Sequence, residues 1–392
     1  MSQNILNMSA ISEALKDYYL PGLRYQFNEK ASALLAQMEK DTESVVGKDI
    51  VMALRYGRVG GIGARDDDGD LPKPNSRKTK QAKWETKNVF ARFQLSDKTI
   101  EASKSSVGAF ASMLEQEIKD CETDAKLDLS RQVLGDGSGE LCEVSAFSTR
   151  TLTVDTTMYL AEGMLIDVID GNSPRTNCDG LEIESVDSDT EFTVVAVTGT
   201  PANGDKVCVQ GSWNKEITGV EKVIDTGGTL YGIDRTDYPF LDAVVETGVG
   251  DITENGIQAR IDEAEKSTGS ETNFLLASYG VRRAYANLLQ ATKSHVNTLD
   301  LKGGWKALSY TAGNQPIPFL GDRYVPEGLL YGLDLEDWKM YKMTDWDWMD
   351  RDGNMLTRVA NKPAWEATLL IYADIGCQRP RGQFVMKGIN EL

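Results

Sequence analysis

The most regular pattern of apolar and polar positions lies between residues 105 and 135. Apolar side chains recur there every three or four residues, which is the spacing of one face of an α-helix, and charged side chains fill the opposite face. At about 1.5 Å per residue the predicted helix is roughly 40 Å long, so it packs along something equally long. Its predicted packing face includes Phe110, Leu114, Ile118 and Leu129.

The ends of this helix are also marked. Ser105 or Ser106 can cap the start, because a hydroxyl there accepts a hydrogen bond from a free backbone N–H. Gly135 can end the helix in the left-handed conformation. The glycine-rich run over residues 134–141 follows a helix instead of preceding one, so it predicts a chain reversal and not a phosphate site.

A pattern of period two, typical of strands, runs through residues 71–100. The stretch opens on Leu-Pro-Lys-Pro, which excludes helix, and it predicts an extended hairpin or paired arms. Its basic side chains could bind single-stranded nucleic acid, with Trp84 and Phe90 stacking on bases. The acidic composition of the whole chain favours contact with an acidic neighbouring subunit instead. The predicted inter-subunit contacts are Arg77, Lys78, Lys80, Lys83, Trp84, Lys87 and Arg92.

Residues 57–70 are too rich in glycine and aspartate to form a regular element. They lack the GxxxxGK[ST] motif of a phosphate loop. Asp66, Asp68 and Asp70 have the spacing of a calcium loop. However, Leu71 occupies the position that needs glycine, and Arg77 the position that needs glutamate. We predict a flexible acidic loop, with no metal and no cofactor.

Residues 141–212 differ in composition from the rest of the chain. Turn signals separate short runs rich in threonine and valine, which predicts a small β-barrel or sandwich. Thirteen acidic residues oppose three basic ones between residues 140 and 212, a local net charge of −10. Such a module could bind a glycan or a cation, or be an inserted surface domain whose charge serves solubility. The predicted strands are residues 151–154, 165–169, 181–186, 192–197 and 206–209.

The C-terminal half alternates between the two periods. Residues 253–267 and 278–292 have the helical spacing, and residues 274–277 form a short apolar run typical of a buried strand, which together predict a mixed α/β unit. Residues 365–372 and 383–387 predict closing strands. The first 41 residues have a helical pattern, broken at Pro21-Gly22.

The composition narrows the classes of function. A net charge of −18 over 392 residues argues against a surface that binds nucleic acid throughout. Five widely spaced cysteines disfavour a disulfide framework or a zinc site and fit a reducing cytoplasm. We find no signal peptide and no apolar run long enough to cross a bilayer.

The patterns of most enzyme families are missing from the sequence. His295 is the one histidine and has no evident partner, and there is no GxSxG, Walker or GxGxxG unit in the required context. Trp346 and Trp348 stand among aspartates and could hold a sugar, or could anchor the edge of a domain. We predict that the chain is not an enzyme.

The order of these parts resembles the tailed-phage major capsid proteins of the Hong Kong 97 type. The resemblance lies in three motifs of residues 60–141: Gly-Ala-Arg-Asp-Asp-Asp-Gly-Asp-Leu-Pro, Phe-Ala-Arg-Phe-Gln-Leu-Ser and Leu-Ser-Arg-Gln-Val-Leu-Gly-Asp-Gly-Ser-Gly. It implies an α+β fold of the Hong Kong 97 type with an inserted small β-barrel or sandwich. The implied parts are an N-terminal arm (1–56), an extended loop with flanking strands (57–104), the spine helix of a peripheral domain (105–140), an inserted β domain (141–212), peripheral-domain strands (213–250), an axial domain (251–359) and closing peripheral-domain strands (360–392).

The function implied by the resemblance is that of a major capsid protein. Such a protein assembles through hexamers and pentamers into an icosahedral shell around double-stranded DNA, without sequence-specific contacts. The shell forms in the cytoplasm of a bacterial host and becomes the capsid of the virion. No membrane is expected among its partners. The implied partners are a separate scaffolding protein, a portal and a decoration protein. The alternatives are the shell protein of a bacterial nanocompartment and a glycan-binding surface protein that uses the acidic β module.

Overall fold

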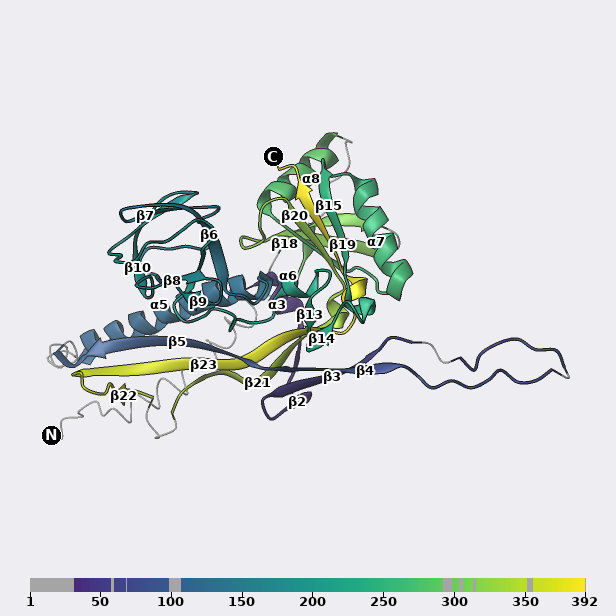
Figure 1. Ribbon diagram of the computed structural model, residues 1–392, viewed down its shortest axis with the longest axis horizontal. Helices are drawn as coiled ribbons and strands as arrows, with labels where there is room; N and C mark the ends of the chain where they lie inside the picture. The colour runs from purple at the N-terminus through teal and green to yellow at the C-terminus, as the bar shows by residue number, and fades with distance from the viewer. Residues whose placement is uncertain are drawn as a thin grey trace.

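The computed structural model describes residues 32–57, 60–67, 69–98, 107–291, 298–302, 306–312, 315–350 and 355–391. Figure 1 shows a long sheet with a long helix beside it, a β module above one end of the sheet and an α/β unit above the other. A thin arm projects beyond the sheet on the side of the α/β unit (Figure 1).

The long-strand sheet is the base of the molecule. Its central strand β23 (Ala364–Cys377) pairs antiparallel with β21 (Trp338–Trp348) and with β5 (Lys87–Ser96). The short strands β1 (Glu39–Asp41) and β22 (Thr357–Arg358) complete it. Alternate residues of β5 are buried, among them Val89, Phe93 and Leu95, as the period of two requires.

The long helix α5 (Val107–Leu134) contacts β5 and confirms the helix predicted over residues 105–135. The predicted caps Ser105 and Ser106 lie outside the described residues. The helix ends at Leu134, just before Gly135 as predicted, but Gly135 does not adopt the left-handed conformation. Gly137 (φ 80°) and Gly139 (φ 82°) adopt it instead, where the chain turns from the helix into the next strand. The amide of Gly135 instead donates to the carbonyls of Arg131 and Gln132.

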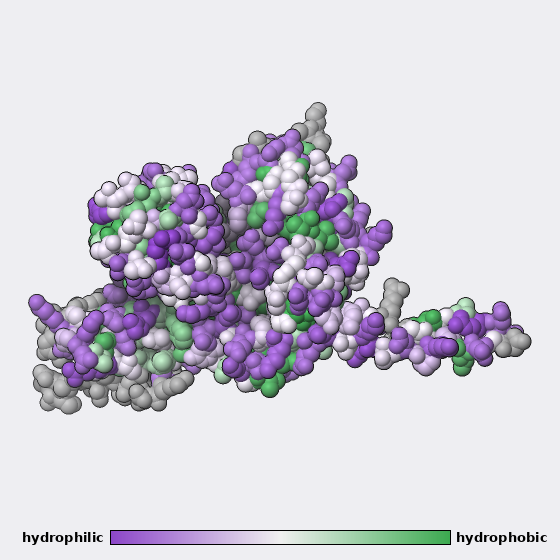
Figure 2. Space-filling model, in the orientation of Figure 1, coloured by the Kyte–Doolittle hydropathy of each residue, from purple (hydrophilic) through white to green (hydrophobic). Residues whose placement is uncertain are grey.

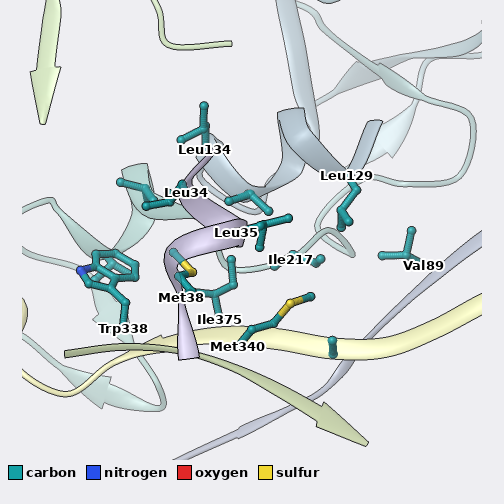
Figure 3. Close-up of a cluster of buried hydrophobic side chains, with 14 of the residues drawn as sticks. Leu34, Leu35, Met38, Val89, Leu129, Leu134, Ile217, Trp338, Met340 and Ile375 are labelled. Carbon is teal, nitrogen blue, oxygen red and sulfur yellow. The ribbon is translucent and has the colours of Figure 1, made fainter. Parts of the chain in front are cut away.

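The main core lies between α5 and the long-strand sheet. The short helix α3 (Ala33–Gln37) is buried there, capped by the Ser32 hydroxyl, which accepts from the amide of Leu34 at 3.2 Å. Figure 3 shows Leu34 and Leu35 of this helix beside Leu134 of α5. Of the predicted N-terminal helix, residues 1–31 lie outside the described residues, and residues 39–41 form a strand.

The β module over residues 140–209 has a core of its own, which includes Phe192, Val168 and Leu152. Its strand order is β10-β11-β7-β6-β12-β8-β9, and β10 also pairs with β8, so the hydrogen bonding returns on itself. The five predicted strands are present, and the sequence reasoning missed the first strand, β6. The strands are β6 (Glu140–Ser148), β7 (Thr151–Val154), β8 (Leu165–Asp170), β9 (Ser173–Pro174), β10 (Leu181–Ser188), β11 (Glu191–Val194) and β12 (Lys206–Val209).

The α/β unit is built on a second seven-stranded sheet, in the order β15-β24-β20-β16-β19-β18-β17. One face packs against α7 and α8 in a separate hydrophobic cluster, and residues such as Phe274 and Leu276 on the other face join the main core. The predicted helices and the buried strand β16 are therefore confirmed. The elements are β15 (Val244–Gly250), α7 (Glu254–Thr268), β16 (Phe274–Ala277), α8 (Tyr279–Ala291), β17 (Thr298–Asp300), β18 (Lys306–Ala312), β19 (Gln315–Gly321), β20 (Leu329–Leu333) and β24 (Phe384–Ile389).

Small elements connect these parts. A three-stranded sheet in the order β2-β3-β4 forms the root of the arm. Within the described residues, no helix combines the length and the apolar character needed to cross a membrane. The small elements are β2 (Val45–Val46), β3 (Asp49–Arg55), β4 (Thr79–Glu85), α6 (Val220–Val223), β13 (Thr229–Leu230), β14 (Ile233–Asp234), η3 (Pro239–Leu241), η5 (Leu335–Asp337) and η6 (Pro380–Gly382).

Three strands lie in a different sheet from the one we predicted. β15, predicted to belong to the peripheral strands, pairs with β24 in the α/β unit, and β24 was itself predicted to return to the peripheral sheet. β21, predicted to be part of the axial domain, pairs with β23 in the long-strand sheet. The chain crosses between the two sheets at η5 and at η6, and periodicity identifies a strand without identifying the sheet to which it belongs.

Candidate functional site

The projecting arm is the feature that stands apart from the cores of the molecule. Its root is the antiparallel pair β3–β4, with Asp49 opposite Glu85 and Arg55 opposite Thr79. Beyond the root, the described residues 56–57, 60–67 and 69–78 form two limbs that stay close. A Cβ on Gly57 would lie 2.8 Å from the Cβ of Lys78, and one on Gly60 would lie 3.1 Å from that of Asn75. Glycine therefore lets the two limbs approach without strand pairing.

This geometry corrects the predicted hairpin of residues 71–100. β4 pairs with the upstream strand β3, while β5 runs in the long-strand sheet beside β23. Thr86 separates the two strands, and its amide donates to the carbonyl of Lys48 at 2.9 Å. The alternating pattern crosses this change of sheet without a break, so it could not locate the boundary.

Aromatic side chains hold the root of the arm to the body. The ring of Trp84 lies 4.2 Å from that of Tyr231 and 5.8 Å from that of Tyr341, measured between centroids. Tyr56 stacks on Phe240 at 5.1 Å. The amide of Lys83 donates to the carbonyl of Tyr231 at 3.1 Å. Trp84, predicted to be an inter-subunit contact, is thus half-buried against its own core.

The basic side chains of the arm fall into two groups. Near the root, Lys83 forms an ion pair with Asp49 at 2.9 Å, and the Lys80 ammonium lies 4.6 Å from the centroid of the Tyr238 ring. Further out, Lys73, Arg77 and Lys78 are exposed. None of these three has an ion pair with any residue that the structure describes. Their charges are therefore available to another molecule.

Exposed apolar side chains lie on both limbs of the same arm. Ile62 is 88% exposed and Leu71 is 86% exposed, which makes them the most exposed large apolar residues of the described chain. Figure 2 shows apolar patches among the hydrophilic surface of the arm. Apolar side chains on a projection without a core gain stability when a partner covers them.

The remaining predicted contacts lie away from the arm. Lys87 and Arg92 are on β5, where Arg92 pairs with Glu366 of β23 at 3.4 Å. On α5, Ile118 and Leu129 are buried as predicted. The side chains of Phe110 and Leu114 lie outside the described residues.

A groove of about 470 Å³ runs beside α5, between β5 and the β module. Phe90, which is 54% exposed, and Leu127, which is 40% exposed, open into it, and Met158 and Met164 of the module line the other side. Burial raises the pKa of Asp124 on the helix, and the neighbouring Asp120 adds to the effect. Sequence reasoning missed this groove, because its two walls are far apart in the chain.

A larger cleft of about 970 Å³ separates the module from α6 and the α/β unit. Tyr159 bridges this cleft, since its hydroxyl donates to the carbonyl of Tyr324 at 3.2 Å. Burial raises the pKa of Glu221. Lys387 lowers this pKa, and nearby carboxylates raise it again. The carboxylates along the cleft are Asp136, Glu140, Asp155, Asp189, Glu221 and Glu327.

The structure also decides between the two interpretations of Trp346 and Trp348, a sugar site or an anchor at a domain edge. Trp346 is fully buried and Trp348 is 3% exposed, so neither ring presents a face to solvent. Trp348 instead packs edge-on against Phe93 of β5 at 6.0 Å. The interpretation of these tryptophans as a sugar site is therefore wrong, and they belong to the core, as the alternative reading of a structural anchor implies. His295 lies outside the described residues.

Comparisons with known proteins place this architecture in a known fold. No family model and no curated protein matches the sequence. Among solved structures, the chain is similar to one in the capsid asymmetric unit of cyanophage A-1(L), with 12% identity over 91% of this chain and 92% of that one, and a TM-score of 0.54. The chain therefore has the mixed α/β fold of a phage capsid protein.

Two further solved structures resemble the chain less closely. A chain of Mycobacterium phage Bobi has 13% identity, covers 99% of this chain and 100% of its own, and gives a TM-score of 0.46. A chain of the SrpI encapsulin complex from Synechococcus elongatus has 7% identity, with 91% and 87% coverage and a TM-score of 0.46.

Proposed function

We propose that this chain is the major capsid protein of a tailed bacteriophage. In this proposal it assembles through hexamers and pentamers into an icosahedral shell that encloses double-stranded DNA. Assembly takes place in the cytoplasm of the bacterial host, and the finished shell is the capsid of the virion. The fold shared with a phage capsid chain supports the class of protein, and the arm supports assembly.

The arm is the observation that carries the proposal. Two limbs of residues 56–78 would extend roughly 35 Å at about 3.3 Å per residue. The limb that leads into β4 carries the exposed cations Lys73, Arg77 and Lys78. The exposed aspartates Asp66, Asp67 and Asp70 lie nearer the tip, and Ile62 and Leu71 are exposed on the two limbs. A projection with this surface gains little as part of a monomer and much as a contact between copies. In a chain of net charge −18, the body of a second copy is an acidic surface of suitable sign.

The parts of the structure suit the roles proposed for them. The long-strand sheet with α5 would form the peripheral domain with its spine helix, and the α/β unit would form the axial domain at the centre of each capsomer. The β module would be an inserted domain on the outer surface. A separate scaffolding protein, a portal and a decoration protein would be its partners, and contacts with DNA would be independent of sequence. No catalytic role is part of this proposal.

Charge reversal on the outer arm tests the proposal. A variant with Lys73→Glu, Arg77→Glu and Lys78→Glu should remain folded, because none of the three side chains pairs with the described part of its own chain. The amount of assembled particles, measured by sedimentation velocity, should be at least tenfold lower than for wild type. A charge-matched control reverses Lys266, Lys306 and Lys362, which are exposed on the body. Normal particles from the arm variant would contradict the role proposed for the arm.

The contents of the particles separate this proposal from a nanocompartment shell. Nuclease-protected double-stranded DNA in particles from infected cells supports the capsid. Particles that hold a protein cargo without nucleic acid would favour the nanocompartment. A glycan array on the isolated β module tests the glycan-binding alternative.

A further inference from the structure

The chain crosses from the long-strand sheet to the α/β unit at two places that lie side by side. One crossing is η5, between β20 and β21, and the other is η6, between β23 and β24. β20 pairs with β24 on one side of the crossings, and β21 pairs with β23 on the other. The amide of Gln378 donates to the carbonyl of Asp337 at 2.9 Å and ties the two crossings together.

Polar side chains fill the space between the crossings. Arg379 Nε donates to Asp337 Oδ1 at 2.6 Å, and Arg379 Nη2 lies 3.6 Å from Asp334 Oδ2. Gln383 Oε1 accepts from the amide of Asp334 at 2.8 Å and from the indole Nε1 of Trp338 at 3.1 Å. Gln383 Nε2 donates to Asp337 Oδ2 at 3.3 Å. Each side chain thus bonds to the other crossing.

Two further elements contribute neutral groups to this network. Ser270, which follows α7, donates its hydroxyl to Asp337 Oδ2 at 3.2 Å. Asn273, which precedes β16, donates from Nδ2 to Asp334 Oδ1 at 3.2 Å, and its Oδ1 accepts from the amide of Leu335 at 2.8 Å. The segment between α7 and β16 of the α/β unit is therefore tied to the same two aspartates.

The charges in this network do not balance. Asp334 is 3% exposed and Asp337 is 2% exposed, and Arg379 is the cation that faces both. Glu336 stands beside them on η5 and adds negative charge. With both aspartates ionised, two buried negative charges face one positive charge, and the Arg379 side chain that carries it is 43% exposed. Two buried carboxylates with this single, partly solvated cation cost free energy in a region of low dielectric constant.

We propose that Asp334, Asp337, Arg379 and Gln383 form a proton-sensitive joint, in which uptake of one proton at Asp334 tightens the connection between the α/β unit and the long-strand sheet. A protonated Asp334 removes the excess charge and leaves Arg379 paired with Asp337. It also retains an oxygen that can accept from Asn273. The proposal concerns the single chain and does not depend on assembly.

The sign of the effect follows from the titration of Asp334. Burial, together with the neighbouring Asp337, raises the pKa of Asp334 to about 6, against an ordinary value of 3.8. An open joint would return the carboxyl to water, so the closed joint binds the proton more tightly. The closed joint therefore gains stability as the pH falls below about 6 and loses it as the pH rises through that value. Between pH 7 and pH 5 the ratio of closed to open states should rise about tenfold.

Hydrogen exchange on the full chain tests the joint. The measured quantity is the protection of peptides that span residues 333–338 and 377–384, corrected for intrinsic exchange, as a ratio between pH 5 and pH 7. Wild type should give a ratio of about ten. Asp334→Asn should bring it close to one, because the amide cannot ionise. Arg379→Gln should raise it above wild type, because both aspartates then lack their cation.

A buried aspartate outside the joint provides the control. Burial also raises the pKa of Asp374, in β23, to about 6, and its carboxylate accepts from the Thr218 amide at 2.7 Å. Asp374→Asn should leave the ratio at the joint unchanged. The proposal is overturned if Asp334→Asn keeps the wild-type ratio. It is also overturned if Asp374→Asn brings the ratio at the joint as close to one as Asp334→Asn does.

Discussion

Arg131 joins the end of α5 to the segment that leaves the β module. Its Nη2 lies 2.6 Å from Glu216 Oε1 and 2.7 Å from Asp128 Oδ1. The Arg131 side chain is 8% exposed and that of Glu216 is 5% exposed. Burial raises the pKa of Glu216, and Arg131 opposes this effect. Removal of one partner of such a buried pair destabilises the fold more than replacement of both partners by apolar side chains.

We expect Glu216→Ala to lower the free energy of unfolding by about 3–5 kcal/mol, because it leaves a buried guanidinium short of a carboxylate. The double variant Arg131→Met with Glu216→Leu should lose less. Urea unfolding measures both. Glu184→Ala is the matched control, because its pair with Arg150 is 48% exposed on each side and should be worth under about 1 kcal/mol. Equal losses for Glu216→Ala and Glu184→Ala would contradict the account of this pair.

Gly332 is fixed by the ring of Phe384. Phe384 of β24 is fully buried and pairs across the sheet with Gly332 of β20, and a Cβ at Gly332 would lie 2.0 Å from Cε1 of its ring. Gly332→Ala should therefore destabilise the chain by about 1–3 kcal/mol through overpacking. Gly135→Ala, whose new Cβ would find its nearest neighbour at 3.6 Å, should cost less in the same unfolding measurement. The opposite order would show that the ring moves aside easily.

At the scale of elements, the β module is connected to the body through two adjacent chain ends. The amide of Asn214 donates to the carbonyl of Ser138 at 2.7 Å, so the chain enters and leaves the module at one place. The module also has its own hydrophobic cluster, and the Tyr159–Tyr324 contact links it to the α/β unit. These features suggest that the module and the remainder fold separately.

Replacement of residues 143–211 by a short glycine-serine linker should leave a folded remainder. The Arg131–Glu216 pair stays in place, because both residues lie outside the excised range. Circular dichroism and a cooperative thermal transition would measure folding of the remainder, and the isolated module should fold as well. An aggregated remainder together with an unfolded module would show that the two share one folding unit.

The sequence pattern predicted most helices and strands, but it did not predict which strands pair with one another. Helices α5, α7 and α8 have strong periodicity, and turn residues such as Gly171 and Gly180, both with positive φ, separate the module strands. The sheet to which β15, β21 and β24 belong was not predicted, because the pattern along a strand identifies the strand without naming its pairing partners. The arm was identified through its charge, but the partner of β4 was predicted to lie downstream when it is the upstream strand β3, which carries a single basic residue.

At the scale of the whole molecule, an acidic body carries an arm with the exposed cations Lys73, Arg77 and Lys78 on the limb that leads into β4. The net charge of the chain is −18, and the β module contributes −10 of it between residues 140 and 212. If the arm binds the body of another copy, the contact combines charge attraction with burial of Ile62 and Leu71. The first contribution is screened by salt and the second is not.

We expect particles to dissociate partly as salt is raised from about 0.1 M to 1 M, where the Debye length falls from about 10 Å to 3 Å. Replacement of Ile62 and Leu71 by serine should increase this sensitivity, because it removes the part of the contact that salt does not screen. Sedimentation velocity over a salt series measures both. Particles whose stability is independent of salt in wild type and in the serine variant would contradict a charged arm contact.

The measurement that tests the central claim most directly is sedimentation velocity with negative-stain microscopy on the full chain, alone and with a candidate scaffolding protein. The account predicts rings of five or six subunits, or closed shells, in at least one of the two conditions. A chain that sediments as a monomer in both conditions, with no rings or shells in the images, would contradict the claim that it is a shell subunit.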